Sequence, residues 1–293
     1  MLLEERIKNL KDITQSEKVI SDFIFNNKDT IKNLSTRDIA RRTFTSSSTI
    51  VRFAKRLNYS GWNELKEDYL SELNYISTHF KNIDANIPFD KNDSFMNIAG
   101  KINILMKETA DDTLSLINYD NLRKAVNLLL NSETIHLLAI SSPLLYGEIF
   151  KYKMTRLGKH VDLVKLSGEI GFNINLVKDN HCALLISYSG ESPLVIRMAK
   201  LLKQRNTPII AITSLGDNSL RKLADVTLSI STREKLYSKI SSYTSEYSIH
   251  YILDLLYSCY FAVNYDENLK SKIDFSKEIE LLRFSNSDFL KEK

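Results

Sequence analysis

The sequence predicts two domains: an all-α N-terminal domain joined to an α/β domain that contains a five-stranded parallel sheet flanked by helices. Residues 1–77 carry apolar residues at helical spacing, whereas residues 78–94 lose this periodicity and contain Pro88. After residue 132, five short apolar runs alternate with helical stretches. A length of 293 residues accommodates both domains.

Composition narrows the class of protein. Lys+Arg number 40 and Asp+Glu 36, and the resulting net charge of +4 is too small to indicate nucleic-acid binding by itself. Cys182 and Cys259 lie in apolar runs, which indicates reduced thiols of a cytoplasmic protein rather than a disulfide framework. The first residues are charged and resemble no signal peptide. The apolar stretch 247–263 contains His250 and Asp254 and is too short for a membrane span, so we expect no membrane partner.

Two helices joined by a short turn are predicted between residues 35 and 57. Ser35 and Ser46 have the chemistry of N-caps. The second helix places one apolar stripe at i, i+3, i+4 and i+7, which we expect to face the core: Ile50, Phe53, Ala54 and Leu57. Hydroxyl and basic side chains occupy its first turn and its opposite face. The predicted DNA-contacting residues are Arg41, Ser46, Ser47, Ser48, Thr49, Arg52 and Lys55.

The charge of this segment is concentrated. Between Arg37 and Arg56 there are six basic residues and one acidic residue, so the local charge is 6 − 1 = +5 and exceeds that of the whole chain. A basic outer face is also common on helices that only meet solvent. DNA binding and a solvated surface therefore both remain open at this point.

The second domain is predicted from its alternating pattern. We expect strands at residues 135–140, 161–166, 182–186, 209–213 and 226–230. We expect helices at residues 95–116, 121–130, 144–157, 168–177, 193–205, 220–224 and 245–263, the last of which closes the domain. Near-continuous apolar strands indicate a parallel sheet buried on both faces.

The loop after the third predicted strand has the composition of an anion site. It reads Ser187-Tyr-Ser189-Gly190-Glu-Ser192 and is followed by a helix that begins near Pro193. Free N–H groups at a helix N-terminus favour an anion, the hydroxyls can donate to phosphate oxygens, and Gly190 permits close approach. Ser192 before Pro193 also matches a helix N-cap with proline in the first turn, which requires no ligand.

Other candidate groups are fewer. Ser141 and Ser142 follow the first strand and offer hydroxyls, although Ser142-Pro143 also fits a cap and first-turn pair. Glu246 and His250 lie one helical turn apart and are the candidates for a general base, yet such pairs more often form a polar contact at a pocket rim. We therefore expect no catalytic residue. The spacing of His and Cys predicts no metal site, and no nucleotide-binding motif predicts a cofactor.

Two motifs carry a family resemblance. Residues 45–66, TSSSTIVRFAKRLNYSGWNELK, resemble the helix-turn-helix of the RpiR/MurR family of bacterial transcriptional regulators, whose pattern is S-x-x-T-[IV]-x-R-F, K-x-L-G-Y-x-G-[FW] and E-L-K. Asn58 replaces the usual glycine and tolerates the left-handed conformation. Residues 187–192 are similar to the phosphate loop S-x-S-G-x-[ST] of SIS (sugar isomerase) domains. Residues 139–143 depart from the family's G-x-G-x-S loop and lack both glycines.

The resemblance implies a domain organisation and a function. It implies a helix-turn-helix domain at 1–77, a linker at 78–94 and a SIS domain at 95–293 with a core at about 121–264. It implies a cytoplasmic regulator of sugar metabolism genes that binds a double-stranded DNA operator as a homodimer and responds to a phosphorylated sugar. Helices 95–116 and 245–263 would form the dimer surface. The alternatives are a sugar-phosphate isomerase-type enzyme and a SIS domain that only dimerises. The implied effector residues are Ser141, Ser142, Ser187, Ser189, Gly190, Ser192 and Glu246.

Overall fold

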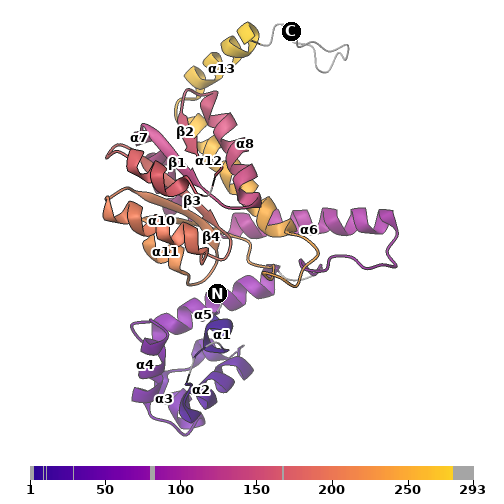
Figure 1. Cartoon of the computed structure of the whole chain (residues 1–293). Coiled ribbons are helices and arrows are strands. Elements are labelled where there is room, and N and C mark those ends of the chain that lie inside the picture. Colours follow the sequence, from indigo (N-terminus) through magenta and orange to yellow (C-terminus); the bar gives the residue numbers. More distant parts are fainter. Residues whose placement is uncertain are drawn as a thin grey trace. The chain divides into compact units, whose positions relative to one another are not determined.

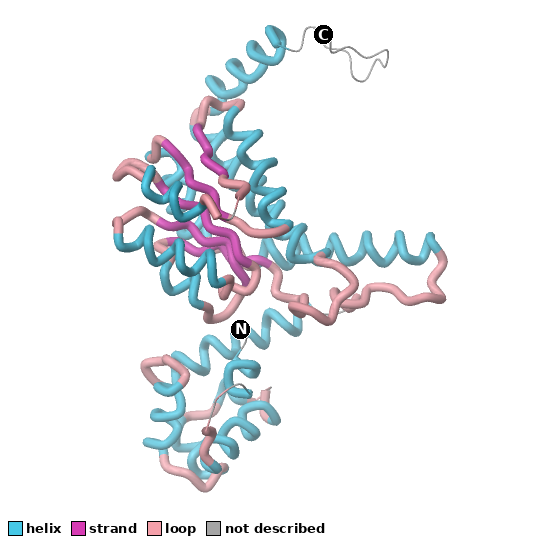
Figure 2. The backbone as a smooth tube through the Cα atoms, viewed as in Figure 1, coloured by secondary structure: helices cyan, strands magenta, loops and turns pink. Residues whose placement is uncertain are grey.

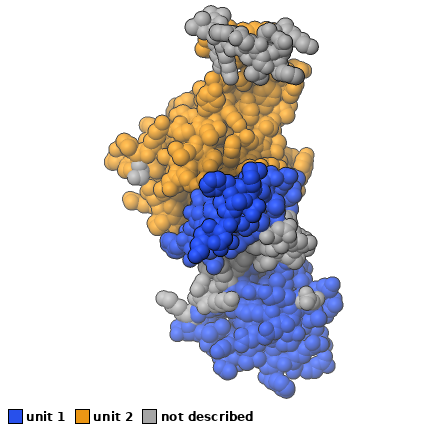
Figure 3. All heavy atoms as spheres, turned by 90° about the vertical axis from the view of Figure 1, so that its right-hand side faces the viewer, with its two compact units in different colours: residues 1–115, 214–218, 231–245 blue, residues 116–213, 219–230, 246–293 orange. Residues whose placement is uncertain are grey.

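The structure is a computed structural model that describes residues 3–8, 10, 12–28, 30–79, 83–166 and 168–279. Residues 80–82 of the expected linker and 280–293 of the expected second domain lie outside the described residues. The chain divides into two compact units (Figure 3). One comprises residues 1–115, 214–218 and 231–245, and the other comprises residues 116–213, 219–230 and 246–293.

Among the described residues up to His79, every secondary-structure element is a helix (Figure 1). These elements are α1 (Leu3–Lys8), α2 (Gln15–Asn26), the 3-10 helix η1 (Ile31–Asn33), α3 (Thr36–Arg42), α4 (Ser47–Arg56) and α5 (Trp62–His79). Capping boxes at Thr14 and Ser35 begin α2 and α3, because each hydroxyl accepts a backbone N–H and the acid three residues later bonds back. The predicted stripe on α4 is buried together with Ile20, Ile24 and Ile39. One hydrophobic core therefore holds these helices together.

Helices α3 and α4 end in the same way. In each, the residue after the C-cap is left-handed: Phe44 has φ 54° and Asn58 has φ 68°. The next N–H then bonds back to the third-last carbonyl of the helix, Thr45 to Ala40 at 2.9 Å and Tyr59 to Ala54 at 3.1 Å. Asparagine tolerates this conformation, as expected for Asn58. For phenylalanine it costs about 1–2 kcal/mol.

Glu72 on α5 is a buried carboxyl in the same region. Its Oε2 accepts the Leu3 N–H at 2.7 Å. Burial raises its pKa to about 7, and nearby Asp68 adds to that rise, while the Leu3 N–H and Arg6 act in the opposite direction. The stability of this region therefore depends on pH.

The helix α6 (Phe95–Ser115) buries Leu105, Thr109, Asp112 and Thr113. An ion pair of 2.9 Å joins Glu108 on α6 to Arg233, which follows the last strand. The helix α5 extends to His79, so residues 78 and 79 of the expected linker are helical, and α6 begins at Phe95.

The second region contains a five-stranded, all-parallel sheet (Figure 2), which confirms the predicted fold class. Its strands are β1 (Thr134–Leu138), β2 (His160–Leu163), β3 (Cys182–Ser187), β4 (Ile209–Ser214) and β5 (Val226–Ile230), in the order β2-β1-β3-β4-β5. Every residue of β1, β3 and β4 is buried. Helices cover both faces, as continuous apolar strands require.

The two faces have separate cores. One contains residues of α7 (Tyr119–Asn131), α8 (Ser142–Thr155) and α12 (Tyr243–Val263). The other contains residues of α10 (Pro193–Gln204) and of the short α11 (Ser219–Leu223). Alternate residues of β3 point into one core or the other: Leu184 and Ile186 into the first, Ala183 and Leu185 into the second.

Two predicted elements differ. The expected helix at 168–177 is two shorter pieces, α9 (Ile170–Asn173) and the 3-10 helix η2 (Ile174–Leu176), because the last turn tightens to bonds such as Val177 N–H to Ile174 O at 3.2 Å. The domain does not close at α12, since α13 (Tyr265–Ile279) follows it. This helix, labelled α13 in Figure 1, buries no residue, so no core-facing stripe predicts it from the sequence. Within the described ranges, no helix is long and apolar enough to cross a membrane.

Candidate DNA-binding and effector-binding sites

The N-terminus of α4 gathers the predicted hydroxyls. Ser46 is the N-cap, and its Oγ accepts the Thr49 N–H at 3.1 Å, which confirms the predicted cap. The same Oγ lies 2.7 Å from Ser48 Oγ and 2.8 Å from Thr49 Oγ1. Ser46 is therefore occupied in holding the helix start. Ser48 is exposed beside it, and Ser47 is half-buried.

The basic surface is smaller than the sequence suggested. Arg56 forms a 2.6 Å ion pair with Glu17 of α2, so it holds two helices together rather than facing solvent freely. Arg41 is exposed but pairs with Asp38 at 3.0 Å, and the Ser35 hydroxyl and N–H keep the pKa of Asp38 below its ordinary value. Within residues 37–56, all of which the structure describes, four exposed cations have no ion pair with a carboxylate: Arg37, Arg42, Arg52 and Lys55. Arg52 and Lys55 lie on the outer face of α4.

The two predicted effector loops flank the point where the sheet changes direction. From β1 the chain moves to β2 on one side, and then returns to β3 on the other side of β1. Ser141 and Ser142 follow β1, and residues 188–192 follow β3. In doubly wound sheets, ligands bind at the carboxyl ends of the two strands at this switch point. The strand order therefore brings together residues that lie about 45 positions apart in the sequence.

The loop after β3 is fixed by hydrogen bonds. Gly190 has φ 67°, a conformation that favours glycine, and its N–H donates to Ser187 O at 3.1 Å. Its carbonyl accepts the Leu220 N–H at 3.0 Å, and Glu191 Oε1 accepts the Ser219 N–H at 2.8 Å. These two bonds tie the loop to α11. The loop is thus shaped in advance of any ligand.

The serine hydroxyls around the switch point are mostly unpaired. Ser192 occupies the N-cap of α10 and Ser141 that of α8, but neither makes a side-chain capping bond. The expected capping role of Ser192 is therefore not present as a hydrogen bond, and Ser142 is the first helical residue rather than the cap. Ser187 and Ser142 also lack a side-chain partner among the described residues. Ser189 differs, because its Oγ accepts the Glu191 N–H at 3.1 Å.

Glu246 contacts α8, the helix that follows the loop after β1. Its Oε2 accepts the Tyr146 hydroxyl at 3.1 Å, and Tyr146 lies one turn after Ser142. Burial, and then the Glu246 charge, raises the pKa of Tyr146. The rings of His250 and Tyr146 are tilted against each other with centroids 5.7 Å apart, and His250 Nε2 lies 3.5 Å from Asp254 Oδ2. Glu246 and His250 thus belong to a polar seam between α8 and α12. The sequence had not indicated Tyr146 as the partner.

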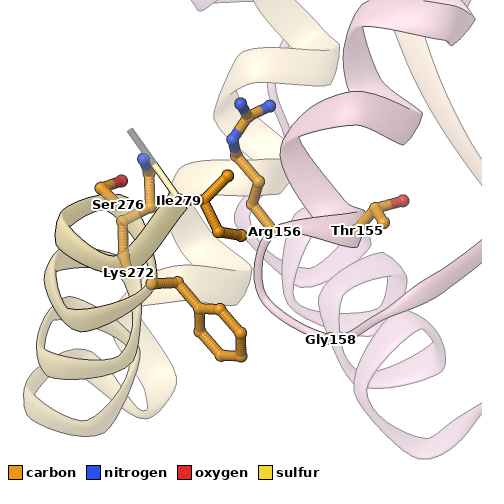
Figure 4. A pocket seen from close by; sticks show the side chains of 7 residues that line it. Thr155, Arg156, Gly158, Lys272, Ser276 and Ile279 are labelled. Carbon is orange, nitrogen blue, oxygen red and sulfur yellow. The ribbon is translucent and has the colours of Figure 1, made fainter. Parts of the chain in front are cut away.

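A cavity of about 280 Å³ lies elsewhere, between the end of α8 and α13 (Figure 4). Its lining includes Arg156, Gly158, Lys272 and Phe275. Since α8 runs antiparallel to the strands, its end lies at the amino edge of the sheet, opposite the switch point. This cavity is therefore distinct from the predicted effector loops. In the described ranges, no cluster of three or more His, Cys, Asp or Glu residues could hold a metal ion.

The structure thus defines a class of two-domain proteins. A helix-turn-helix region is followed by a doubly wound sheet, and a serine-rich loop of this sheet is the candidate ligand site. Comparison with family models identifies both parts. Residues 1–74 match the helix-turn-helix domain of the rpiR family, and residues 128–256 match the SIS domain. The chain therefore joins an rpiR-family helix-turn-helix domain at its N-terminus to a SIS domain.

Solved structures share this fold. The Vibrio vulnificus NanR protein complexed with ManNAc-6P is 19% identical with a TM-score of 0.61, and the match covers 97% of this chain and 100% of that chain. The sugar isomerase domain of an RpiR transcription factor from Sphaerobacter thermophilus is 13% identical with a TM-score of 0.55, covering 61% and 98%. A putative phosphosugar isomerase involved in capsule formation from Bacteroides fragilis is 20% identical with a TM-score of 0.52, covering 59% and 96%.

Proposed function

We propose that the protein is a cytoplasmic, DNA-binding transcriptional regulator of sugar metabolism genes, and that a phosphorylated sugar bound in its SIS domain controls its affinity for an operator. In this proposal residues 1–77 bind DNA, residues 78–94 form the linker, and residues 95–293 bind the effector and dimerise. The protein acts as a homodimer and is not an enzyme.

The observation that carries the effector half is the set of unpaired hydroxyls at the switch point. Ser187 and Ser192 bracket the loop after β3, and Ser141 and Ser142 lie between β1 and the first turn of α8. Hydroxyls and free N–H groups at the start of α10 suit a phosphate, because the helix dipole favours negative charge there. NanR, whose fold matches along nearly the whole chain, was solved with ManNAc-6P. This compound is accordingly the first probe.

The DNA half rests on α4 and its charges. Ser47, Ser48 and Thr49 form the first turn, where short side chains can approach base edges, and Arg52 and Lys55 follow on the outer face. In a dimer, two copies of α4 would enter successive major grooves of a near-palindromic operator. If the sugar binds one dimer arrangement more tightly than another, it shifts the population that binds DNA.

The test begins with selection of a duplex from a random-sequence DNA library by the wild-type protein. Fluorescence anisotropy then measures the affinity of wild type and Arg52→Ala for this duplex, with and without ManNAc-6P. We expect Arg52→Ala to weaken binding by about 1–3 kcal/mol, and the sugar to change the wild-type affinity. Arg123→Ala, which alters an exposed cation on α7, is the matched control and should bind like wild type. Failure to enrich any duplex would refute the DNA-binding half.

The isomerase alternative is supported by two contacts of Tyr146, one with Glu246 and one with His250, because either partner could supply a general base. Incubation of the protein with hexose 6-phosphates and ManNAc-6P, followed by NMR of the sugars, tests this alternative. We expect no turnover. Turnover that disappears in Glu246→Ala would establish an enzyme instead.

A further inference from the structure

Phe44 is an apolar residue of the helix-turn-helix region for which the proposed function gives no role. It lies between α3 and α4, the two helices so labelled in Figure 1, and 97% of its surface is exposed. No other large apolar residue of the described helix-turn-helix region approaches this exposure: Val19 follows at 37%. Burial of a phenyl ring is favourable, so its complete exposure contributes nothing to this fold.

The backbone at Phe44 makes the choice of residue more unusual. Its φ of 54° is a conformation that favours glycine or asparagine. Asn58 occupies the corresponding position at the end of α4, with φ 68°, and there the residue suits the geometry. The same C-terminal motif therefore contains a residue that suits its geometry in α4, Asn58, and a strained, exposed aromatic residue in α3, Phe44. Positions that break a local folding rule without a compensating contact are those where function is expected.

The turn also holds Phe44 in place. The Thr43 N–H donates to Ile39 O at 2.8 Å, and the Thr45 N–H donates to Ala40 O at 2.9 Å. The Thr43 hydroxyl donates to Ile39 O at 2.7 Å and lies 2.9 Å from the Thr45 hydroxyl. Both neighbours of Phe44 are thus bonded to α3. The ring projects from a fixed support rather than from a mobile loop.

The surroundings indicate the partner. Phe44 precedes the N-cap of α4 by two residues, so it stands at the end of the helix that carries Ser47 and Ser48. Arg41 and Arg42 are exposed on the preceding turn, and Arg52 is exposed on α4. An exposed apolar ring in a segment that carries several exposed arginines complements a polyanion that offers a few apolar groups. In duplex DNA, the major groove offers the thymine methyl group.

We propose that Phe44 contacts a thymine methyl group at the edge of the major groove entered by α4, and thereby selects an A·T pair at that position. This inference rests on the proposed DNA-binding function and adds a residue that reads sequence. Serine hydroxyls and Arg52 supply hydrogen bonds and charge, whereas Phe44 supplies the apolar contact.

The test uses Phe44→Asn, because the chain itself places asparagine at the corresponding position of α4. The variant relieves the strained backbone, so we expect its Tm to equal or exceed that of wild type. Its affinity for the selected duplex should nevertheless fall by about tenfold, the loss expected when a phenyl ring no longer leaves water. Ile87→Asn removes another exposed apolar residue, outside the helix-turn-helix, and should bind DNA like wild type.

Replacement of each thymine in the duplex by uracil removes one methyl group at a time. We expect one position at which uracil weakens wild-type binding and has no effect on Phe44→Asn. Sedimentation of both proteins checks that assembly is unchanged. Equal DNA affinity, an unchanged uracil effect in the variant, or a dissociated dimer would each overturn the inference, the last in favour of a contact with a second copy. A wild-type protein that binds no duplex would overturn both this inference and the proposed function, whereas an intact Arg52 effect without a Phe44 effect would overturn this inference alone.

Discussion

Gly190→Ala is the sharpest test of the effector loop, because the chain contains a matched control. Gly190 has φ 67° and Gly158 has φ 74°, so an added Cβ imposes a similar backbone cost at both positions. That cost is about 1–2 kcal/mol. A Cβ on Gly158 would meet nothing within 4 Å, and Gly158 lies at the opposite edge of the sheet from the switch point. Without ligand, each variant should therefore melt a few degrees below wild type.

The two variants should diverge when a sugar phosphate is added. At a concentration of about 100 times the wild-type Kd, the ligand adds about 2.7 kcal/mol to stability. If movement of the loop removes one hydrogen bond to a charged phosphate, about 1.5–3 kcal/mol, the affinity falls by roughly 10- to 100-fold. The ligand then adds only about 1.4 to 0.4 kcal/mol in Gly190→Ala. In Gly158→Ala it still adds about 2.7 kcal/mol.

The assay is thermal unfolding of the three proteins across a titration of ManNAc-6P, with inorganic phosphate in parallel. The quantity compared is the ligand-induced rise in Tm, which is independent of the starting stability to a first approximation. Equal rises in Gly190→Ala and Gly158→Ala would show that the loop after β3 does not hold the phosphate. A rise lost only in Gly158→Ala would instead place the ligand in the cavity beside α13.

Three further predictions concern single positions. Asn58→Ala should lower the free energy of unfolding by about 1 kcal/mol in urea titrations, because alanine is strained at φ 68°, whereas Asn58→Gly should not lower it. Glu72 has a pKa of about 7 in the folded protein and 4.5 in the unfolded chain, so the folded protein binds more protons between these two pH values. The free energy of unfolding should therefore fall as the pH rises from 4.5 to 7. Urea titrations at pH 5 and pH 8 should show this fall in wild type and not in Glu72→Gln. Tyr146→Phe should destabilise by about 1 kcal/mol, since the Glu246 carboxylate loses a donor, and an unchanged melting curve would contradict the contact.

The sequence predicted elements wherever periodicity and burial coincide. The strands β1, β3 and β4 are predicted as apolar runs because every one of their residues is buried. The helix α4 is predicted from its stripe of Ile50, Phe53, Ala54 and Leu57. The sequence does not predict α13, because this helix buries no residue. It predicts a single helix over residues 168–177 because a 3-10 turn has nearly the same apolar spacing as an α-helix.

The site was less accessible to sequence reasoning because it depends on long-range geometry. The residue types of the serine loop predicted an anion site, but the strand order that sets it beside Ser141 is a property of the whole sheet. The pairing of Arg56 with Glu17 joins residues 39 positions apart, so counting charges overstated the basic surface. An aromatic residue in a predicted turn indicates that Phe44 is exposed. No sequence pattern indicates that its backbone is left-handed.

The reversal of winding at β1 has a consequence for how such a domain diversifies. The connections that follow β1 and β3 begin after these strands have ended. Residues in these connections can therefore change while the two strands keep their pairing. The substitutions at 139–143 illustrate this freedom, since β1 remains fully buried beneath a loop without glycine. We therefore expect that exchange of these two short connections would change the sugar preference of the proposed effector site while the pairing of the strands is kept.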